Sequence, residues 1–184
     1  MARLDETAFL VLHEVRLRGV APLEESPSVV RLVEVGFVVR SVRGVRITPA
    51  GRAEHARLAR IEPGSDAAVA VHRAHQRFLP LNRELLRICH DWQVARDWAV
   101  IDRLRSLDER AGPVVSRLGR TVPRFAAYRP RLRAAFVRVD EGDGEWLTSP
   151  KLDSYHTVWM QLHEDLLLAL GTDRSEESSE ESPR

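Results

Sequence analysis

Histidines and acids at helical spacing are the residues of this chain that could bind a metal ion. His72 and His75 lie three residues apart, as do Asp153 and His156, and such pairs share one face of a helix. A zinc site needs more ligands than two, and the chain lacks the His-Glu-x-x-His pattern. Cys89 is the only cysteine, which excludes an intramolecular disulfide and a cysteine-built zinc site. The pattern therefore predicts surface or partly buried histidines, a buried thiol and no metal or other cofactor.

Aromatic and imidazole side chains could also form a ligand pocket. His156 and His163 lie seven residues apart, so they share a helix face next to Trp159. Together with Tyr155 and Trp92, they could line a cavity that binds a small aromatic or anionic effector. The alternative, which we favour, is that these rings belong to the hydrophobic core and that their polar atoms are satisfied locally.

Arginine is concentrated in two stretches where acids are scarce. Residues 1–39 carry four arginines against six acids, whereas 40–60 carry six arginines and a single acid, Glu54. A second stretch, 110–138, has eight arginines and no acid, and an acidic loop, 140–145, follows it. This second stretch could hold a phosphate-bearing ligand or extend a DNA footprint. The alternative, which we favour, is a solvated face paired with acids of the same protein or of a second copy.

The first sixty residues alternate helix and strand signals. Apolar residues at intervals of three and four predict a helix over 4–18, which Gly19 ends. A Ser-Pro start and a glycine stop predict a short helix over 26–36. β-branched residues on both sides of an Arg43-Gly44 turn predict a hairpin over 37–47, and a Thr-Pro start predicts a helix over 48–62.

Beyond this point the strand signals stop and helical spacing dominates. The predicted helices cover 66–94 with a kink at Pro80, 97–122 with a split or bend at Gly112-Pro113, 123–139 with an irregular first turn, and 150–170. Such helices are typical of an antiparallel bundle. The remaining residues are rich in serine and acids and contain no aromatic, which predicts disorder. The predicted organisation is a domain over 1–62, a bundle over 63–171 that dimerises or senses a ligand, and a disordered acidic tail over 172–184.

The segments "LVEVGFV" and "ITPAGR" lie before and after the predicted hairpin. With the order helix, short helix, hairpin, helix, they resemble the winged-helix domain of bacterial transcriptional regulators of the MarR and PadR type, over about the first 60 residues. The resemblance implies that the short helix enters the major groove, where Ser28 and Arg31 face bases, and that the hairpin tip lies along the DNA backbone or in the minor groove. The basic residues that would serve the phosphates are Arg40, Arg43, Arg46 and Arg52.

Two further segments, "PLNRELLRICHDWQV" and "DSYHTVWMQLHEDLLLALG", are similar to a helical region of small bacterial regulators and of extensions of some phosphoenolpyruvate-utilising phosphotransferases. The chain has no Gly-rich phosphate loop and no G-x-x-x-x-G-K-[ST] motif. Nothing in the sequence assembles a nucleophile, a base and an orienting group, so we expect no enzyme activity.

These patterns favour a DNA-binding transcriptional regulator of the mainly α class, with a winged helix-turn-helix followed by an antiparallel helical bundle. The expected partners are double-stranded DNA, a second copy in a homodimer, and a small-molecule effector or a protein partner. The amino terminus lacks the uninterrupted apolar run of a signal peptide, and no run is long enough to span a membrane. The expected location is therefore the cytoplasm.

The alternative function is a degenerate winged helix that serves as a protein-protein interaction module on an enzyme or a regulator. The link "VAPLEE" between Gly19 and Ser26 is too short for the middle helix that braces the reading helix in the regulators. It also places Glu24 and Glu25, with Glu34 further on, where acids would repel the DNA backbone.

Overall fold

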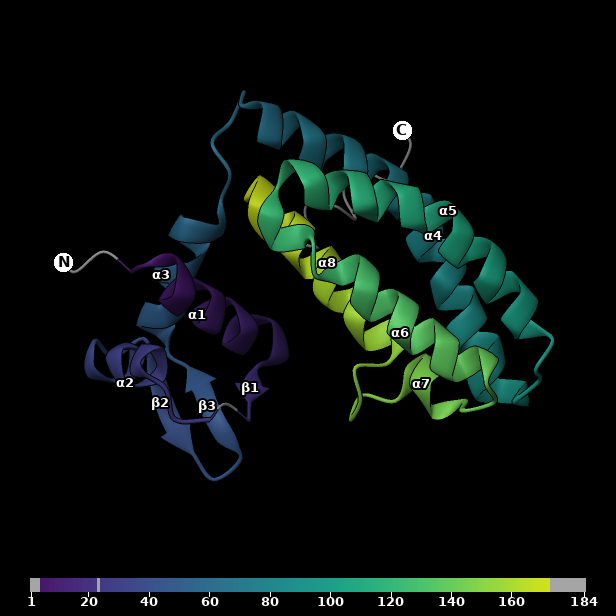
Figure 1. The fold of residues 1–184 in the computed structure, drawn as a ribbon, viewed down its shortest axis with the longest axis horizontal. Coiled ribbons are helices and arrows are strands. Elements are labelled where there is room, and N and C mark those ends of the chain that lie inside the picture. Colours follow the sequence, from purple (N-terminus) through teal and green to yellow (C-terminus); the bar gives the residue numbers. More distant parts are fainter. Residues whose placement is uncertain (1–3, 23, 173–184) are drawn as a thin grey trace, which may run out of the picture. The chain divides into compact units, whose positions relative to one another are not determined.

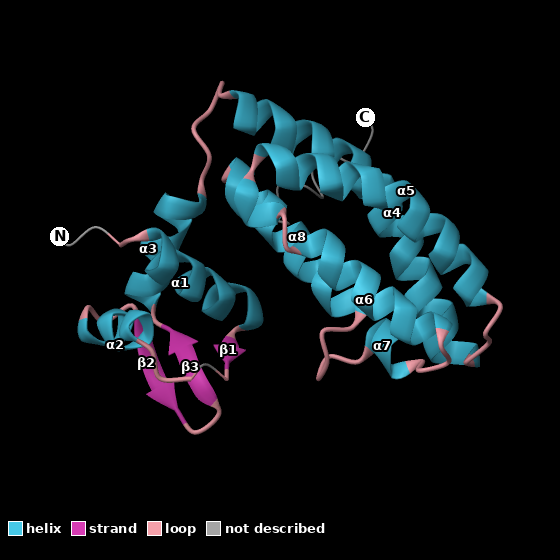
Figure 2. Cartoon of the chain, in the orientation of Figure 1, coloured by secondary structure: helices cyan, strands magenta, loops and turns pink. Residues whose placement is uncertain are grey.

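The computed structural model describes residues 4–22 and 24–172, which divide into two units (Figure 1). The sheet-containing unit comprises the described residues up to Ile61 together with 167–172, and the helical unit comprises 62–166. The described chain is mainly helical, and its strands form one small antiparallel sheet (Figure 2). No helix within these described residues is long and apolar enough to cross a bilayer. The predicted disorder of 173–184 falls outside the described residues.

The sheet-containing unit follows the predicted order of helices and hairpin. Asp5 caps the first helix by accepting a hydrogen bond from the Ala8 amide at 2.8 Å, and Gly19 ends it at a φ of 75°. Ser26 caps the second helix, and Pro27 is its first residue, as predicted. The elements are α1 (Glu6–Arg18), β1 (Val20–Ala21), α2 (Pro27–Glu34), β2 (Val38–Ser41), β3 (Gly44–Ile47) and α3 (Pro49–Ala59).

The sheet has the strand order β1-β3-β2, with both pairs antiparallel. Strand β1 was not predicted, because two residues are too short to show the alternation of a strand. Ser41 pairs with Gly44, so the hairpin turn consists of Val42 and Arg43, one residue earlier than predicted. Alternation along β3 then buries Val45 and exposes Arg46.

The core of this unit lies between the helices and the inner face of the sheet. Its apolar members include Leu12, Leu32, Val38 and Val45, all buried. The close approach of α3 to the hairpin depends on Gly51, since a Cβ there would come within 2.0 Å of the Phe37 carbonyl oxygen. The core therefore fixes the position of the first turn of α3 against the hairpin.

The helical unit contains longer helices than the first, with bounds close to the predicted ones. Ser65, rather than Asp66, caps the long helix by accepting a hydrogen bond from the Ala68 amide at 3.1 Å. Burial of Cys89 in this helix raises the pKa of its thiol to about 12, which confirms the predicted buried thiol. The elements are α4 (Asp66–Ala95), α5 (Val100–Thr121), the 3-10 helix η1 (Pro123–Phe125), α6 (Tyr128–Asp140), α7 (Glu145–Thr148) and α8 (Tyr155–Leu170).

The predicted split at Gly112-Pro113 is wrong, because α5 continues through both residues. Pro113 is exposed, as is Glu109 one turn earlier, so the carbonyl that loses its amide partner faces water. Gly112 is buried and leaves room for the Arg129 side chain, whose Cζ would lie 3.1 Å from an added Cβ. The glycine thus serves helix packing rather than a helix break.

The last helix begins at Tyr155, later than the predicted start after Ser149. Ser154 supplies the competing cap, since its Oγ accepts a hydrogen bond from the Thr157 amide at 3.2 Å. The short helix α7 in the acidic loop was not predicted, whereas the irregular turn at the start of 123–139 is confirmed as η1. Gly171 follows α8 at a φ of 72°, as the predicted end requires.

Candidate nucleic-acid interface

Three arginines of the sheet-containing unit surround one hollow of about 590 Å3 at the hairpin, which we call the hairpin hollow. Arg43 lies in the turn, Arg46 in β3 and Arg52 in the first turns of α3, and all three side chains are exposed. The remaining lining is formed by Gly19, Val20, Ser41, Val42 and Ile47. The hollow therefore combines three cations with a partly apolar surface.

Local sequence signals place these three side chains. The two-residue turn puts Arg43 at the tip of the hairpin, and alternation along β3 turns Arg46 outward, opposite Val20 and Val39. Thr48 caps α3 by accepting a hydrogen bond from the Gly51 amide at 3.0 Å, which fixes the start of the helix that carries Arg52. Each arginine thus depends for its position on a turn, a strand register or a helix cap.

The three arginines of the hairpin hollow differ electrically from Arg40. Arg40 donates two hydrogen bonds to the Glu25 carboxylate, at 2.7 and 2.8 Å, and this interaction raises the pKa of the guanidinium. By contrast, no described carboxylate lies within ion-pair distance of Arg43, Arg46 or Arg52. Among the four arginines of the hairpin site, the positive charge available to an external anion therefore belongs to the three that line the hairpin hollow.

The short helix α2 offers less than the hairpin to a polyanion. Ser28 is half-buried, and Arg31 lies 3.4 Å from the carboxylate of Asp5. Glu34, at the end of the helix, is exposed. Since Glu25 is occupied by Arg40, one of the two acids in the preceding link is already neutralised. The outward face of α2 therefore has no cation comparable to the three of the hairpin hollow.

The aromatic residues considered for a ligand pocket occupy core positions. Tyr155 and Trp159 are fully buried, with ring centroids 6.0 Å apart. The Tyr155 hydroxyl donates to Asp108 at 3.2 Å, and the Trp159 indole donates to Asn82 at 3.0 Å. The polar atoms of both rings are therefore already engaged within the protein.

The other residues of that proposed pocket are spread along the unit. His163 is buried beside Phe78, whereas Trp92 packs its ring edge-on against Trp98. His156 is half-buried, and burial lowers the pKa of its imidazole. Neither the hairpin hollow nor a second hollow between α4 and α5 is lined by any of the five residues. A ligand site built from them stays a prediction.

The second arginine stretch, 110–138, is largely paired within the protein, which confirms the favoured interpretation for six of its eight arginines. In two of these pairs the carboxylate is buried. Asp108 accepts hydrogen bonds from Arg129 at 2.6 and 3.0 Å, and Asp165 lies 3.1 Å from Arg124. The other pairs are Arg110 with Glu84, Arg131 with Asp153, Arg133 with Asp108 and Arg138 with Asp143. The acidic loop supplies few of these partners, so most pairs join different helices.

Residues outside the predicted site also bear on the surface at the hairpin. Val42 is fully exposed in the turn, and Val39 is exposed on β2. Because the turn was predicted one residue too late, Val42 was not expected to lie in it.

No group of three or more metal-ligating side chains occurs among residues 4–22 and 24–172. Comparisons with protein-family models, curated proteins and solved structures find no match to this chain.

Proposed function

We propose that this protein binds double-stranded DNA through the hairpin hollow and acts as a cytoplasmic transcriptional regulator, assembled as a homodimer. One observation carries the proposal: Arg43, Arg46 and Arg52 surround a single hollow and have no described carboxylate partner. DNA presents a regular row of phosphates, and arginines that are not already neutralised supply the affinity for it.

The winged-helix assignment is supported by the element order and by the three-stranded sheet. In such domains the β2–β3 hairpin is the wing, and α2 is the reading helix. Because α2 has only eight residues and Arg31 lies beside Asp5, base reading contributes less than phosphate contact. The proposal therefore assigns most of the affinity to the wing and predicts binding that depends strongly on salt.

An interaction module is the second candidate, and exposed apolar residues favour it. Val42 at the hairpin tip and Val39 beside it give the wing an apolar edge, which fits a protein surface better than a phosphate backbone. The exposed acid at the end of α2 favours the same alternative. The two candidates differ in whether the hairpin arginines or the hairpin valines supply the binding energy.

The test is a fluorescence-anisotropy titration of the full chain against labelled duplex DNA at several salt concentrations. The variant Arg43→Ala/Arg46→Ala should bind all sequences more weakly, and its salt slope should be smaller than that of the wild type by about two. Arg120→Ala is the matched control, since Arg120 is an exposed arginine of the helical unit. An unchanged slope in the double variant would contradict the wing assignment, and an absence of binding at low salt would favour the interaction module.

A further inference from the structure

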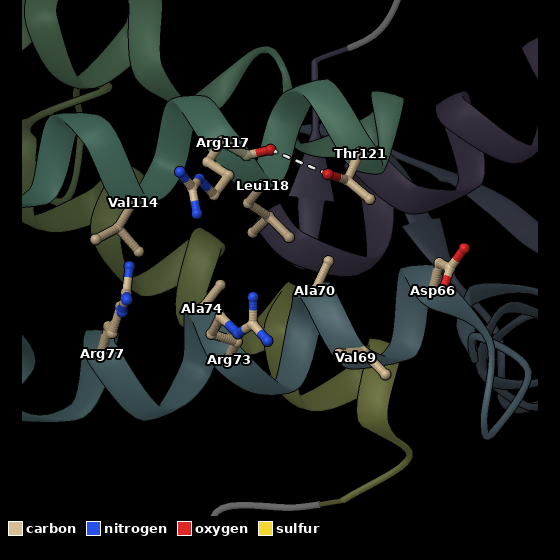
Figure 3. Close-up of a pocket in the computed structure, with 10 residues that line it drawn as sticks. All are labelled: Asp66, Val69, Ala70, Arg73, Ala74, Arg77, Val114, Arg117, Leu118 and Thr121. Atoms are coloured by element: carbon tan, nitrogen blue, oxygen red, sulfur yellow. Dashed lines mark hydrogen bonds between the residues drawn. The ribbon is translucent and has the colours of Figure 1, made fainter.

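The helical unit contains a second hollow, of about 230 Å3, between α4 and α5, which we call the α4–α5 hollow (Figure 3). Ala74 and Leu118 are buried and form its apolar floor, and Val69 and Val114 extend this surface. Three arginine side chains, two from α4 and one from α5, reach into the same space (Figure 3). An apolar floor beside clustered cations is the composition of a site for an amphiphilic anion.

The seam between the two helices explains why cations meet at this place. The helices run antiparallel, and near the far end of the seam Arg103 lies 2.6 Å from the Asp91 carboxylate. Seven residues further along α5 and seven residues back along α4, Arg110 lies 2.6 Å from Glu84. Seven residues correspond to two helical turns, so the seam repeats one acid–arginine pair every two turns.

The next step of the same repeat places arginine on both helices. Seven residues beyond Arg110 is Arg117, and seven residues before Glu84 is Arg77, and both line the α4–α5 hollow. Arg73 lies one turn from Arg77 on the same helix, a spacing at which like charges repel. No described carboxylate lies within ion-pair distance of these three arginines. An external anion would therefore supply the charge that the first two pairs obtain from Asp91 and Glu84.

The acid in the lining does not replace that anion. Asp66 stands at the first residue of α4, and Figure 3 shows it at the end of the hollow away from Arg77. Eleven residues of helix separate Asp66 from Arg77, which is about 16 Å along the helix axis. The end of the hollow away from Asp66 is therefore lined by guanidinium groups and not by a carboxylate.

We infer that the α4–α5 hollow binds a small amphiphilic anion, with a phosphate or carboxylate group between Arg73, Arg77 and Arg117 and an apolar body on Ala74 and Leu118. Guanidinium groups bind both kinds of acid group through paired hydrogen bonds. The volume is below the roughly 300–1,000 Å3 of sites for drug-sized ligands, which limits the occupant to a small molecule. The hollow lies wholly within the helical unit, so the inference does not depend on DNA binding by the other unit.

The first experiment is calorimetric titration of the full chain with hexyl phosphate, inorganic phosphate and 1-hexanol. Hexyl phosphate should bind at one site and at least about tenfold more tightly than inorganic phosphate, while 1-hexanol alone should not bind measurably. Equal affinity for hexyl phosphate and inorganic phosphate would overturn the inference, as would equal affinity for hexyl phosphate and 1-hexanol. Hexanoate is titrated in the same way. Whichever of hexanoate and hexyl phosphate binds more tightly identifies the acid group that the site prefers.

The second experiment replaces the missing anion by mutation. Arg117→Glu places a carboxylate opposite Arg77 and extends the acid–arginine repeat, so hexyl phosphate should bind about 10- to 100-fold more weakly while the thermal midpoint of unfolding is not lowered. Arg87→Glu makes the same change at an exposed residue of α4 outside the lining, ten residues or about 15 Å along the helix axis from Arg77, and should leave the affinity unchanged at 0.15 M salt, where the Debye length is about 8 Å. Wild-type affinity in Arg117→Glu, or equal weakening in both variants, would overturn the inference.

The third experiment asks whether the chain supplies its own anion. Residues 173–184 carry five acids, and a segment of that composition could compete for the same arginines. A variant that ends at Thr172 should bind hexyl phosphate with the affinity of the full chain. A gain of more than about tenfold in the truncated variant would overturn the inference, because the acidic segment would then be the natural occupant.

Discussion

Arginine occurs in two different electrostatic environments in this protein. One is the helical stretch 110–138, and the other is the hairpin hollow. In the helical stretch most guanidinium groups lie against a carboxylate, and two of these carboxylates, Asp108 and Asp165, are buried. At the hairpin hollow no described carboxylate approaches Arg43, Arg46 or Arg52. The number of arginines in a stretch therefore does not show how much positive charge is open to an external anion, because most of these side chains are paired within the protein.

The α4–α5 hollow sharpens this comparison, because it lies in the helical unit and yet its arginines resemble those of the hairpin. It differs from the hairpin hollow in its floor, which consists of buried apolar side chains. The hairpin offers an exposed edge that can follow an extended polyanion, whereas the helical seam offers a small pocket. We propose that arginine stabilises the fold, contacts DNA or binds a small molecule according to the residues that surround it.

The largest effect is expected where a paired arginine is removed. Arg129→Ala leaves the buried carboxylate of Asp108 without its bidentate partner, which should lower the free energy of unfolding by about 3–5 kcal/mol in urea denaturation. Arg133→Ala is the matched control, because the exposed guanidinium of Arg133 lies 4.0 Å from the same carboxylate and should contribute less than about 1 kcal/mol. Equal losses in the free energy of unfolding for the two variants would contradict the claim that Arg129 stabilises the fold more than the exposed Arg133.

A smaller effect, of opposite sign in two variants, is expected along the α4–α5 seam. Arg103→Ala removes an exposed ion pair with Asp91 and should lower the free energy of unfolding by about 0–1 kcal/mol. Arg117→Ala removes a cation that faces Arg77 and should leave this free energy unchanged or slightly higher. Calorimetric unfolding of both variants measures the difference. A loss in Arg117→Ala as large as that in Arg103→Ala would mean that Arg117 has an internal role.

The smallest expected effect is the pH dependence of stability that comes from a histidine. Arginine keeps its charge between pH 5 and 8, whereas the ordinary pKa of histidine lies in this range, and burial lowers the pKa of the His156 imidazole below 6.5. The unfolded chain then binds the proton more readily than the folded one, so stability should fall as the pH drops below about 6.5. His156→Gln should flatten this part of a pH series of urea unfolding curves. An identical series for the wild type and the variant would show that His156 does not contribute.

Local signals in the sequence were sufficient for most helices. Caps at Asp5, Ser26 and Thr48 act within three residues of the helices that they start, and a single chain shows them directly. The errors arose where tertiary contacts decide: Gly112 and Pro113 stay helical because one side of α5 packs against Arg129 and the other faces water. Strand β1 forms only because β3 pairs with it.

The candidate sites were less accessible from the sequence, because ion pairs form between distant residues. Spacing showed that Arg40 belongs to a basic stretch, but not that Glu25 would occupy it. The heptad repeat of the α4–α5 seam is present in the sequence, yet it becomes visible only when the two helices are aligned. A search for charged residues seven apart on consecutive predicted helices would have found Arg77 and Arg117.

The central claim, that the hairpin binds DNA through the arginines that have no carboxylate partner, is tested most directly by releasing Arg40. Glu25→Gln removes the carboxylate that contacts Arg40 of strand β2. It leaves the three arginines of the hairpin hollow unchanged. We predict a salt slope of about −3 for duplex DNA binding by the wild type, from three phosphate contacts, and a tighter complex with a slope steeper by about one in Glu25→Gln. Equal slopes and affinities for the two proteins, or no binding by either at low salt, would contradict the claim.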